Sequence, residues 1–200
     1  MIAIIDYGAG NIFSVKNALD YLGVENKLTA DKNEICAADE IILPGVGAFP
    51  WAMKMLRDSG LVDTIREEAR KKPFLGICLG MQLIFDKGYE FEETDGLRLI
   101  GGKVEKIDRK DMIIPHMGWN ELVINRDCPI LKSLPEHPYV YFVHSYAAVC
   151  DDANVSAYCD YGGKITALVH DGAYVYGAQF HPEKSGEVGL QMLRNFAELA

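Results

Sequence analysis

One stretch near the middle of the chain restricts the fold more than any other. Residues 74–77 form a short apolar run typical of a buried strand, and a helical pattern begins near Leu79. Between them lies Gly76-Ile77-Cys78-Leu79-Gly80. Glycines on both sides of Cys78 indicate a sharp strand-to-helix turn, because a side chain pushed out of such a turn leaves no room for neighbouring Cβ atoms. We therefore predict the Gly-x-Cys-x-Gly form of a nucleophile elbow.

Cys78 at this turn has two interpretations. A free cysteine is often a small buried hydrophobic side chain with no chemical role. Alternatively, the free N–H groups and the positive dipole end of the following helix point at the sulfur, which favours the nucleophilic thiolate. The flanking glycines, the preceding strand and the following helix together favour the second interpretation.

A second segment, far along the chain, supplies a base for this nucleophile. Residues 174–180 are typical of a strand, and Pro182 pushes His181 into an extended backbone. Positions i and i+2 of an extended segment face the same side, so His181 and Glu183 should point together. A carboxylate fixes the tautomer of an imidazole, which can then polarise a thiol. His-x-Glu alone is also compatible with surface decoration, but combined with Cys78 it predicts a Cys-His-Glu triad.

These motifs resemble those of class I glutamine amidotransferases. Three further stretches are similar to the glutaminase subunit of imidazole glycerol phosphate synthase. These stretches are Pro44-Gly45-Val46-Gly47, Pro115-His116-Met117-Gly118-Trp119-Asn120 and Tyr141-Phe142-Val143-His144-Ser145-Tyr146. The resemblance spans the sequence from residue 6 to its end. The resemblance implies that Cys78 attacks the side-chain carboxamide of glutamine. It also implies that His181 passes the thiol proton to the leaving ammonia, and that Glu183 orients His181.

The residues around the predicted triad follow partly from chemistry and partly from the resemblance. An acyl transfer needs two N–H donors aimed at the developing oxyanion. One should be the N–H of Leu79, just after the nucleophile, and the resemblance places the other at Val46 or Gly47. The 44–47 stretch by itself is equally compatible with a plain turn. Residues expected by resemblance to contact the substrate glutamine are Gly47, Gln82, Ser145 and Tyr146.

The resemblance also implies a partner. Ammonia would pass to a synthase (cyclase) subunit of (β/α)8-barrel fold, in a heterodimer that forms imidazole glycerol phosphate and an aminoimidazole carboxamide ribotide. The docking face is expected to include Asn11, Trp119 and Asn120, in loops clustered at the strand ends around Cys78. No cofactor is expected for the glutaminase reaction, and the five cysteines and five histidines show no metal-ligand spacing.

Two alternatives remain open at this point. The chain is also compatible with the glutaminase of a sister amidotransferase, such as those of pyridoxal phosphate or anthranilate synthesis, because these share the triad. It is further compatible with a non-catalytic protein of similar fold that keeps Cys78 as a redox sensor. His181-Pro182-Glu183 argues against the sensor, which needs no oriented base.

Composition limits the remaining function classes. A chain of 200 residues with 49% hydrophobic and 24% charged residues is typical of one soluble globular domain, here expected to span residues 1–200. The formal net charge of −9 argues against non-specific nucleic-acid binding and against binding to anionic membranes. An odd number of cysteines without Cys-x-x-Cys favours a reducing compartment. The apolar residues 2–5 are too few for a signal peptide, so we expect a cytoplasmic protein.

The order of predicted elements indicates an α/β fold. Strand and helix patterns alternate in the first half, which predicts a mixed, mostly parallel sheet flanked by helices, and the second half is rich in strands. In such sheets the ligand binds beyond the carboxyl ends of the strands, where Cys78 and the loops 6–11 and 44–47 should lie. The acidic stretch 90–95 is expected to be a solvated loop. The predicted strands are residues 2–5, 25–29, 40–43, 74–77, 102–107, 121–124, 139–146, 155–161, 166–170 and 174–179, and the predicted helices are residues 12–22, 49–58, 61–71 and 188–199, besides the one after Cys78.

Overall fold

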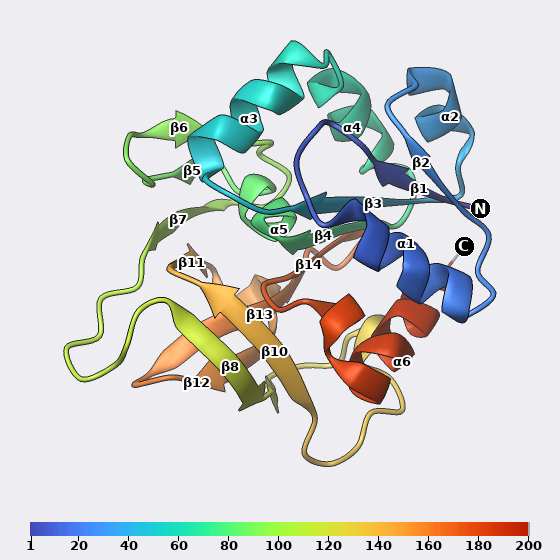
Figure 1. The fold of residues 1–200 in the computed structure, drawn as a ribbon. Helices are drawn as coiled ribbons and strands as arrows, with labels where there is room; N and C mark the ends of the chain where they lie inside the picture. The colour runs from blue at the N-terminus through green and yellow to red at the C-terminus, as the bar shows by residue number, and fades with distance from the viewer. Residues whose placement is uncertain (200) are drawn as a thin grey trace.

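The computed structural model describes residues 1–199; residue 200, the last of the predicted domain, lies outside the described residues. Strands of its main sheet are β1 (Ile2–Ile5), β2 (Asn26–Thr29), β3 (Glu40–Gly45), β4 (Phe74–Cys78), β9 (Val123–Ile124), β12 (Val155–Asp160), β13 (Lys164–His170) and β14 (Val175–Ala178). Their spatial order is β2-β1-β3-β4-β14-β13-β12-β9 (Figure 1). Neighbours are parallel from β2 to β14 and antiparallel beyond it, which confirms the predicted mixed, mostly parallel sheet.

Helices cover both faces of the parallel part of this sheet. On one face lie α1 (Ile12–Tyr21) and α6 (Gly186–Ala197); on the other lie α2 (Lys32–Ala37), α3 (Phe49–Asp58), α4 (Val62–Glu68) and α5 (Leu79–Leu83), as Figure 1 shows. Successive strand residues alternate between the two cores. Leu75 and Ile77 pack with α1 and α6, whereas Phe74 packs with α3 and α4. This alternation explains why the central strands β1 and β4 are continuous apolar runs.

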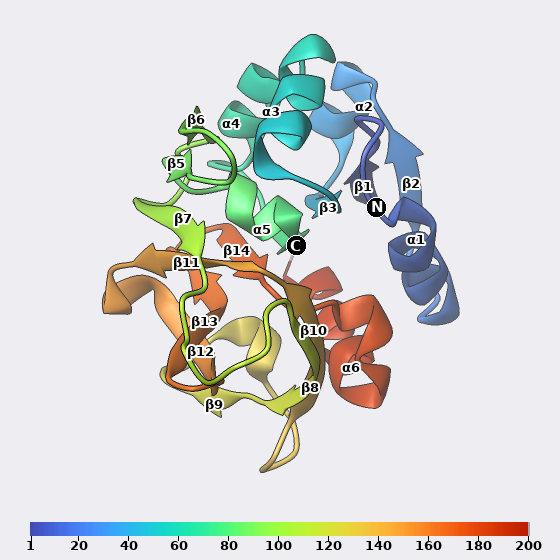
Figure 2. The same cartoon turned by 60° about the vertical axis from the view of Figure 1, so that its left-hand side comes forward.

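The strands outside the main sheet form two smaller sheets, one of two strands and one of four (Figure 2). β10 (Tyr139–His144) pairs antiparallel with β8 (His116–Glu121), with His144 opposite His116. β7 (Gly102–Lys106) lies between β11 (Tyr146–Cys150) and β5 (Lys87–Gly88), which in turn pairs with β6 (Thr94–Asp95). Ser145 therefore separates two strands that belong to different sheets.

Several local predictions were wrong. Trp119 and Asn120, expected in a loop, lie within β8 because the segment pairs along its whole length with β10. The acidic stretch is no simple loop either, since it ends in β6. Helix α2 was missed; Asp31 caps its N-terminus by accepting hydrogen bonds from the backbone N–H groups of Asn33 and Glu34.

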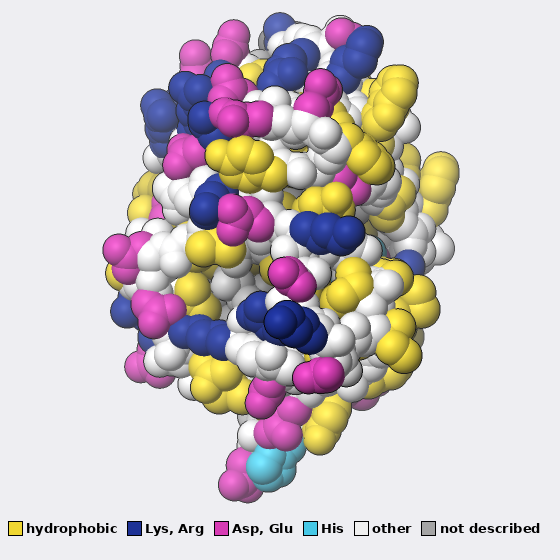
Figure 3. Space-filling model, turned by 90° about the vertical axis from the view of Figure 1, so that its left-hand side faces the viewer, with side chains coloured by type: hydrophobic (Ala, Val, Ile, Leu, Met, Phe, Trp, Pro, Cys, Tyr) yellow, Lys and Arg dark blue, Asp and Glu magenta, His cyan; other side chains and the backbone are white. Residues whose placement is uncertain are grey.

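One face of the molecule is mixed in charge. Figure 3 shows one face on which Lys and Arg side chains alternate with Asp and Glu, with hydrophobic side chains scattered between them. Within residues 1–199, no helix has the length and apolar character needed to cross a membrane.

Candidate active site

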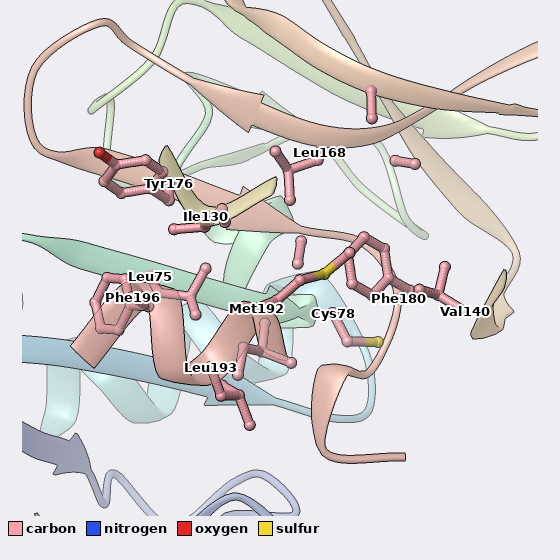
Figure 4. Close-up of a cluster of buried hydrophobic side chains, with 14 of the residues drawn as sticks. Leu75, Cys78, Ile130, Val140, Leu168, Tyr176, Phe180, Met192, Leu193 and Phe196 are labelled. Carbon is pink, nitrogen blue, oxygen red and sulfur yellow. The ribbon is translucent and has the colours of Figure 1, made fainter. Parts of the chain in front are cut away.

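Cys78 occupies a sharp and strained turn at the end of β4. Its backbone has φ 56° and ψ −110°, a left-handed conformation that costs a non-glycine residue about 1–3 kcal/mol. The two glycines of the motif are required by close packing. A Cβ on Gly76 would lie 2.6 Å from the carbonyl oxygen of Gly80, and one on Gly80 would lie 1.9 Å from that of Leu43. Figure 4 shows the Cys78 side chain at the edge of the buried cluster that contains Phe180 and Met192.

His181 and Glu183 form a buried pair. His181 Nδ1 donates a hydrogen bond of 2.8 Å to Glu183 Oε1, and the two side chains are 3% and 1% exposed. The backbone reason differs from the one predicted. His181 is extended, as expected before proline, but Pro182–Lys184 form a 3-10 turn. The turn, rather than a continuous strand, brings the carboxylate back to the imidazole.

Charge and burial act in opposite directions on His181. Burial by itself lowers the pKa of His181, but hydrogen bonds with Cys78 and Glu183 outweigh it and raise the pKa to about 9. Because Nδ1 is bonded to Glu183, Nε2 is the nitrogen left for the Cys78 sulfur. At neutral pH the raised pKa favours the imidazolium form of His181, and a cationic imidazole beside a cysteine sulfur is the arrangement that activates a cysteine nucleophile.

A cavity of about 220 Å³ opens beside Cys78. Its lining residues are Val46, Gly47, Cys78, Leu79, Gln82, Glu90, Pro115, Val143, His144, Ser145 and Tyr146. Every residue predicted for the oxyanion hole or for substrate contact is among them. A larger and more open hollow of about 1070 Å³ lies between α3 and β6, but none of the predicted site residues lines it.

Hydrogen bonds hold the walls of this cavity. Gln82 Nε2 donates to the carbonyl oxygen of Tyr146 and to Gln179 Oε1, each at 3.0 Å. Gly47 has φ +103°, a conformation that glycine adopts without strain. The hydroxyl of Tyr7 donates a 3.2 Å hydrogen bond to the carbonyl oxygen of Pro44, so the loop after β1 supports the segment that carries Val46 and Gly47.

The three residues predicted for the partner interface do not line the cavity. Asn11 precedes α1 and accepts a hydrogen bond of 2.9 Å from the Ser14 hydroxyl. Trp119 is 54% exposed, with its ring centroid 6.1 Å from that of Tyr141. The Asn120 side chain turns toward His116. Their role at an interface stays a prediction.

Sequence reasoning missed one charged residue of the cavity. Glu90 lies in the acidic stretch, where nothing in the sequence distinguishes it from its neighbours. In the structure its Oε2 accepts a hydrogen bond of 2.8 Å from the backbone N–H of Phe49, at the start of α3. This bond and the positive end of the α3 dipole hold a carboxylate at the cavity wall.

The structure gives no sign of a metal centre at this site. Within residues 1–199, no group of three or more His, Cys, Asp or Glu side chains is arranged to hold a metal ion. All five cysteines, which lie in that part of the chain, are free thiols.

Comparison with known proteins places this geometry in a family. The model of the glutamine amidotransferase class-I family matches residues 3–199. The chain is 51% identical over 197 residues to the imidazole glycerol phosphate synthase subunit HisH of Bacillus cereus (strain G9842), covering 98% of this chain and 93% of that protein. It is 48% identical over 201 residues to the subunit of the same name from Listeria monocytogenes serotype 4a (strain HCC23), covering 100% and 96%.

A solved structure supports the same assignment at the level of the fold. The crystal structure of a glutamine amidotransferase matches with a TM-score of 0.77 at 22% sequence identity, over 100% of this chain and 98% of that one. The fold class predicted from the sequence is therefore confirmed. By sequence and by fold, this chain belongs to the class-I glutamine amidotransferase family.

Proposed function

We propose that this chain is the glutaminase subunit of an imidazole glycerol phosphate synthase and supplies ammonia for histidine biosynthesis. The observation that carries the proposal is the hydrogen bonding of Cys78 with the buried His181–Glu183 pair, beside a cavity lined by every residue predicted to contact the substrate. Relatives near 50% identity over nearly the whole chain bear the name of that synthase subunit.

The reaction begins with the sulfur of Cys78. The thiolate attacks the side-chain carbonyl carbon of glutamine and forms a C–S bond. Imidazolium His181 gives its Nε2 proton to the departing nitrogen, the C–N bond breaks, and ammonia leaves. Glu183 stabilises the cation and fixes the ring by accepting from Nδ1. His181, now neutral, takes a proton from water, whose oxygen attacks the carbonyl carbon of the thioester. The C–S bond then breaks, Cys78 returns as the thiolate and glutamate is released.

The cavity walls supply binding and charge stabilisation. The backbone N–H of Leu79 and one from Val46 or Gly47 donate to the oxyanion of each tetrahedral intermediate. The family resemblance assigns the binding of glutamine to Gln82, Ser145 and Tyr146. We assign Glu90 to the substrate α-ammonium group, since it is the one acidic residue among the cavity lining and glutamine carries a positive charge at that end.

The ammonia acceptor is the synthase (cyclase) subunit, a (β/α)8 barrel that docks as a heterodimer over Asn11, Trp119 and Asn120. Exposed aromatic side chains support a docking face, because Phe13 is 66% and Trp119 54% exposed. In this arrangement residues 1–200 act as one unit that delivers ammonia to imidazole glycerol phosphate and aminoimidazole carboxamide ribotide formation.

The test is glutamate release by three mixtures: the purified chain, the chain with a cyclase subunit, and the chain with that subunit and its nucleotide substrate. We expect a low rate alone and a rise of about 10²–10³-fold in the full mixture, the range that one oxyanion donor supplies. Equal rates in all three mixtures would remove the partner from the mechanism. Release stimulated only by the synthase of another pathway would assign the chain to that pathway.

A further inference from the structure

Two buried histidines form a hydrogen-bonded chain that the proposed reaction does not use. His144 Nδ1 lies 2.8 Å from the carbonyl oxygen of Tyr146, and His144 Nε2 lies 3.0 Å from His116 Nδ1. His116 Nε2 lies 2.7 Å from the side-chain oxygen Oδ1 of Asn120. The imidazoles are 6% and 0% exposed, whereas Asn120 is partly exposed. The Tyr146 end of this hydrogen-bonded chain is thus a wall of the cavity, and the Asn120 end reaches toward solvent.

The number of hydrogens on the four ring nitrogens of His116 and His144 follows from the partners at each end of the hydrogen-bonded chain. The carbonyl oxygen of Tyr146 only accepts, so His144 Nδ1 must carry a hydrogen. In the structure the Asn120 oxygen faces His116, so that end accepts as well, and His116 Nε2 would need a hydrogen. One more hydrogen must sit between the two rings. Three hydrogens on four ring nitrogens make the pair a cation, whereas an Asn120 N–H facing His116 leaves two hydrogens and a neutral pair.

The surroundings favour the neutral pair. Burial lowers the pKa of His144 to about 4, with further lowering by His116 and His181, and burial also lowers the pKa of His116. The His116 ring is stacked between Phe142 and Tyr161, at centroid distances of 4.8 and 3.9 Å. The Asn120 amide has a donor and an acceptor end and exchanges them by a half turn. A neutral pair therefore requires the half turn of the Asn120 amide that brings its N–H₂ group toward His116 in place of Oδ1.

We infer that His116 and His144 form a one-directional hydrogen-bond chain, running from the Asn120 N–H₂ group to the Tyr146 carbonyl, that positions the Ser145–Tyr146 wall for glutamine. His144 Nδ1–H and Gln82 Nε2–H then share the Tyr146 carbonyl oxygen and fix the break between β10 and β11. Both histidines act through Tyr146, so they are positioning residues. Their role in glutamine binding rests on the proposed function, but the direction of the chain does not.

The direction is tested by nitrogen NMR of the ¹⁵N-histidine-labelled protein at pH 7. We expect Nδ1 protonated and Nε2 unprotonated in both His116 and His144. Asn120→Asp replaces the amide by an acceptor of the same shape, so one extra proton should appear on the pair, while Asn120→Leu should leave it neutral. An Nε2–H on either ring of the unsubstituted protein, or an unchanged pair in Asn120→Asp, would overturn the inference.

The positioning role is tested by two substitutions of one residue, with glutamate release as the assay. In His144→Asn, the side-chain amide nitrogen takes the place of Nδ1 and can still donate to the Tyr146 carbonyl oxygen. In His144→Gln, the amide nitrogen takes the place of Nε2, so the hydrogen bond to Tyr146 is lost. We expect KM for glutamine to rise about tenfold in His144→Gln, the effect of one lost hydrogen bond, and less than about threefold in His144→Asn, with kcat little changed in both. Equal KM values would refute the positioning role. Failure of the unsubstituted protein to hydrolyse glutamine would refute the proposed function instead, and the NMR result would stand.

Discussion

A methyl group added at Gly80 tests the turn that carries Cys78. The Cβ of Gly80→Ala would lie 1.9 Å from the carbonyl oxygen of Leu43 and 2.9 Å from its carbonyl carbon. Both atoms belong to the backbone of β3, which is held between β1 and β4. Since unstrained carbon contacts lie near about 3.5 Å, α5 and β3 would have to separate by roughly 1.5 Å.

The size of the effect follows from this geometry. Overpacking usually costs about 1–3 kcal/mol, and contact with a paired backbone places Gly80→Ala at the upper end, so we expect the free energy of unfolding to fall by about 3 kcal/mol. Leu79 and Gln82 move with α5. A displacement of about 1 Å in reacting geometry costs about 100-fold, so glutamate release should fall at least that far.

Urea unfolding followed by circular dichroism measures the stability, and glutamate release measures the activity. Gly101→Ala is the matched control, because a Cβ there would meet only Asp86 Oδ2, at 3.9 Å. It should change the free energy of unfolding by less than about 0.5 kcal/mol. If Gly80→Ala behaved like this control in both assays, the tight contact between α5 and β3 would not be what fixes the elbow.

The other predictions concern the triad. Cys78→Ala should abolish glutamine hydrolysis while the synthase still runs on ammonium salt, and in NMR titration the pKa of His181 should fall below about 9 because the hydrogen bond with Cys78 is lost. His181→Ala should remove nearly all glutamate release, and Glu183→Gln should cost less, within the roughly 10²–10⁴-fold range of such groups; a silent Glu183→Gln would make the carboxylate structural only. The pKa of His181 is raised from 6.5 to about 9 in the folded protein, so protonated His181 stabilises the fold. This contribution to the free energy of unfolding should be complete below pH 6.5 and be lost as the pH rises through about 9. Urea unfolding across that pH range measures it.

The sequence by itself determined the elements whose signals are local. The strand–turn–helix at Cys78 was predictable because the steric demand of a tight turn requires glycine on both sides, and the structure shows the close contacts at Gly76 and Gly80. Strand β1 and helix α3 were predicted with the bounds observed, since each has a continuous apolar run or a helical apolar stripe. The family followed from motifs of a few residues.

Tertiary structure decided what depends on residues far apart in the chain. Residues 115–120 carry no strand signal of their own, and β8 exists because β10 pairs with it. The acidic stretch gave no reason to single out Glu90, whose place at the cavity depends on a hydrogen bond to the start of α3. The pairing of His116 with His144 arises from cross-strand register, which places them opposite each other. Local sequence periodicity describes one element at a time, whereas register and cavity walls are set by packing between elements.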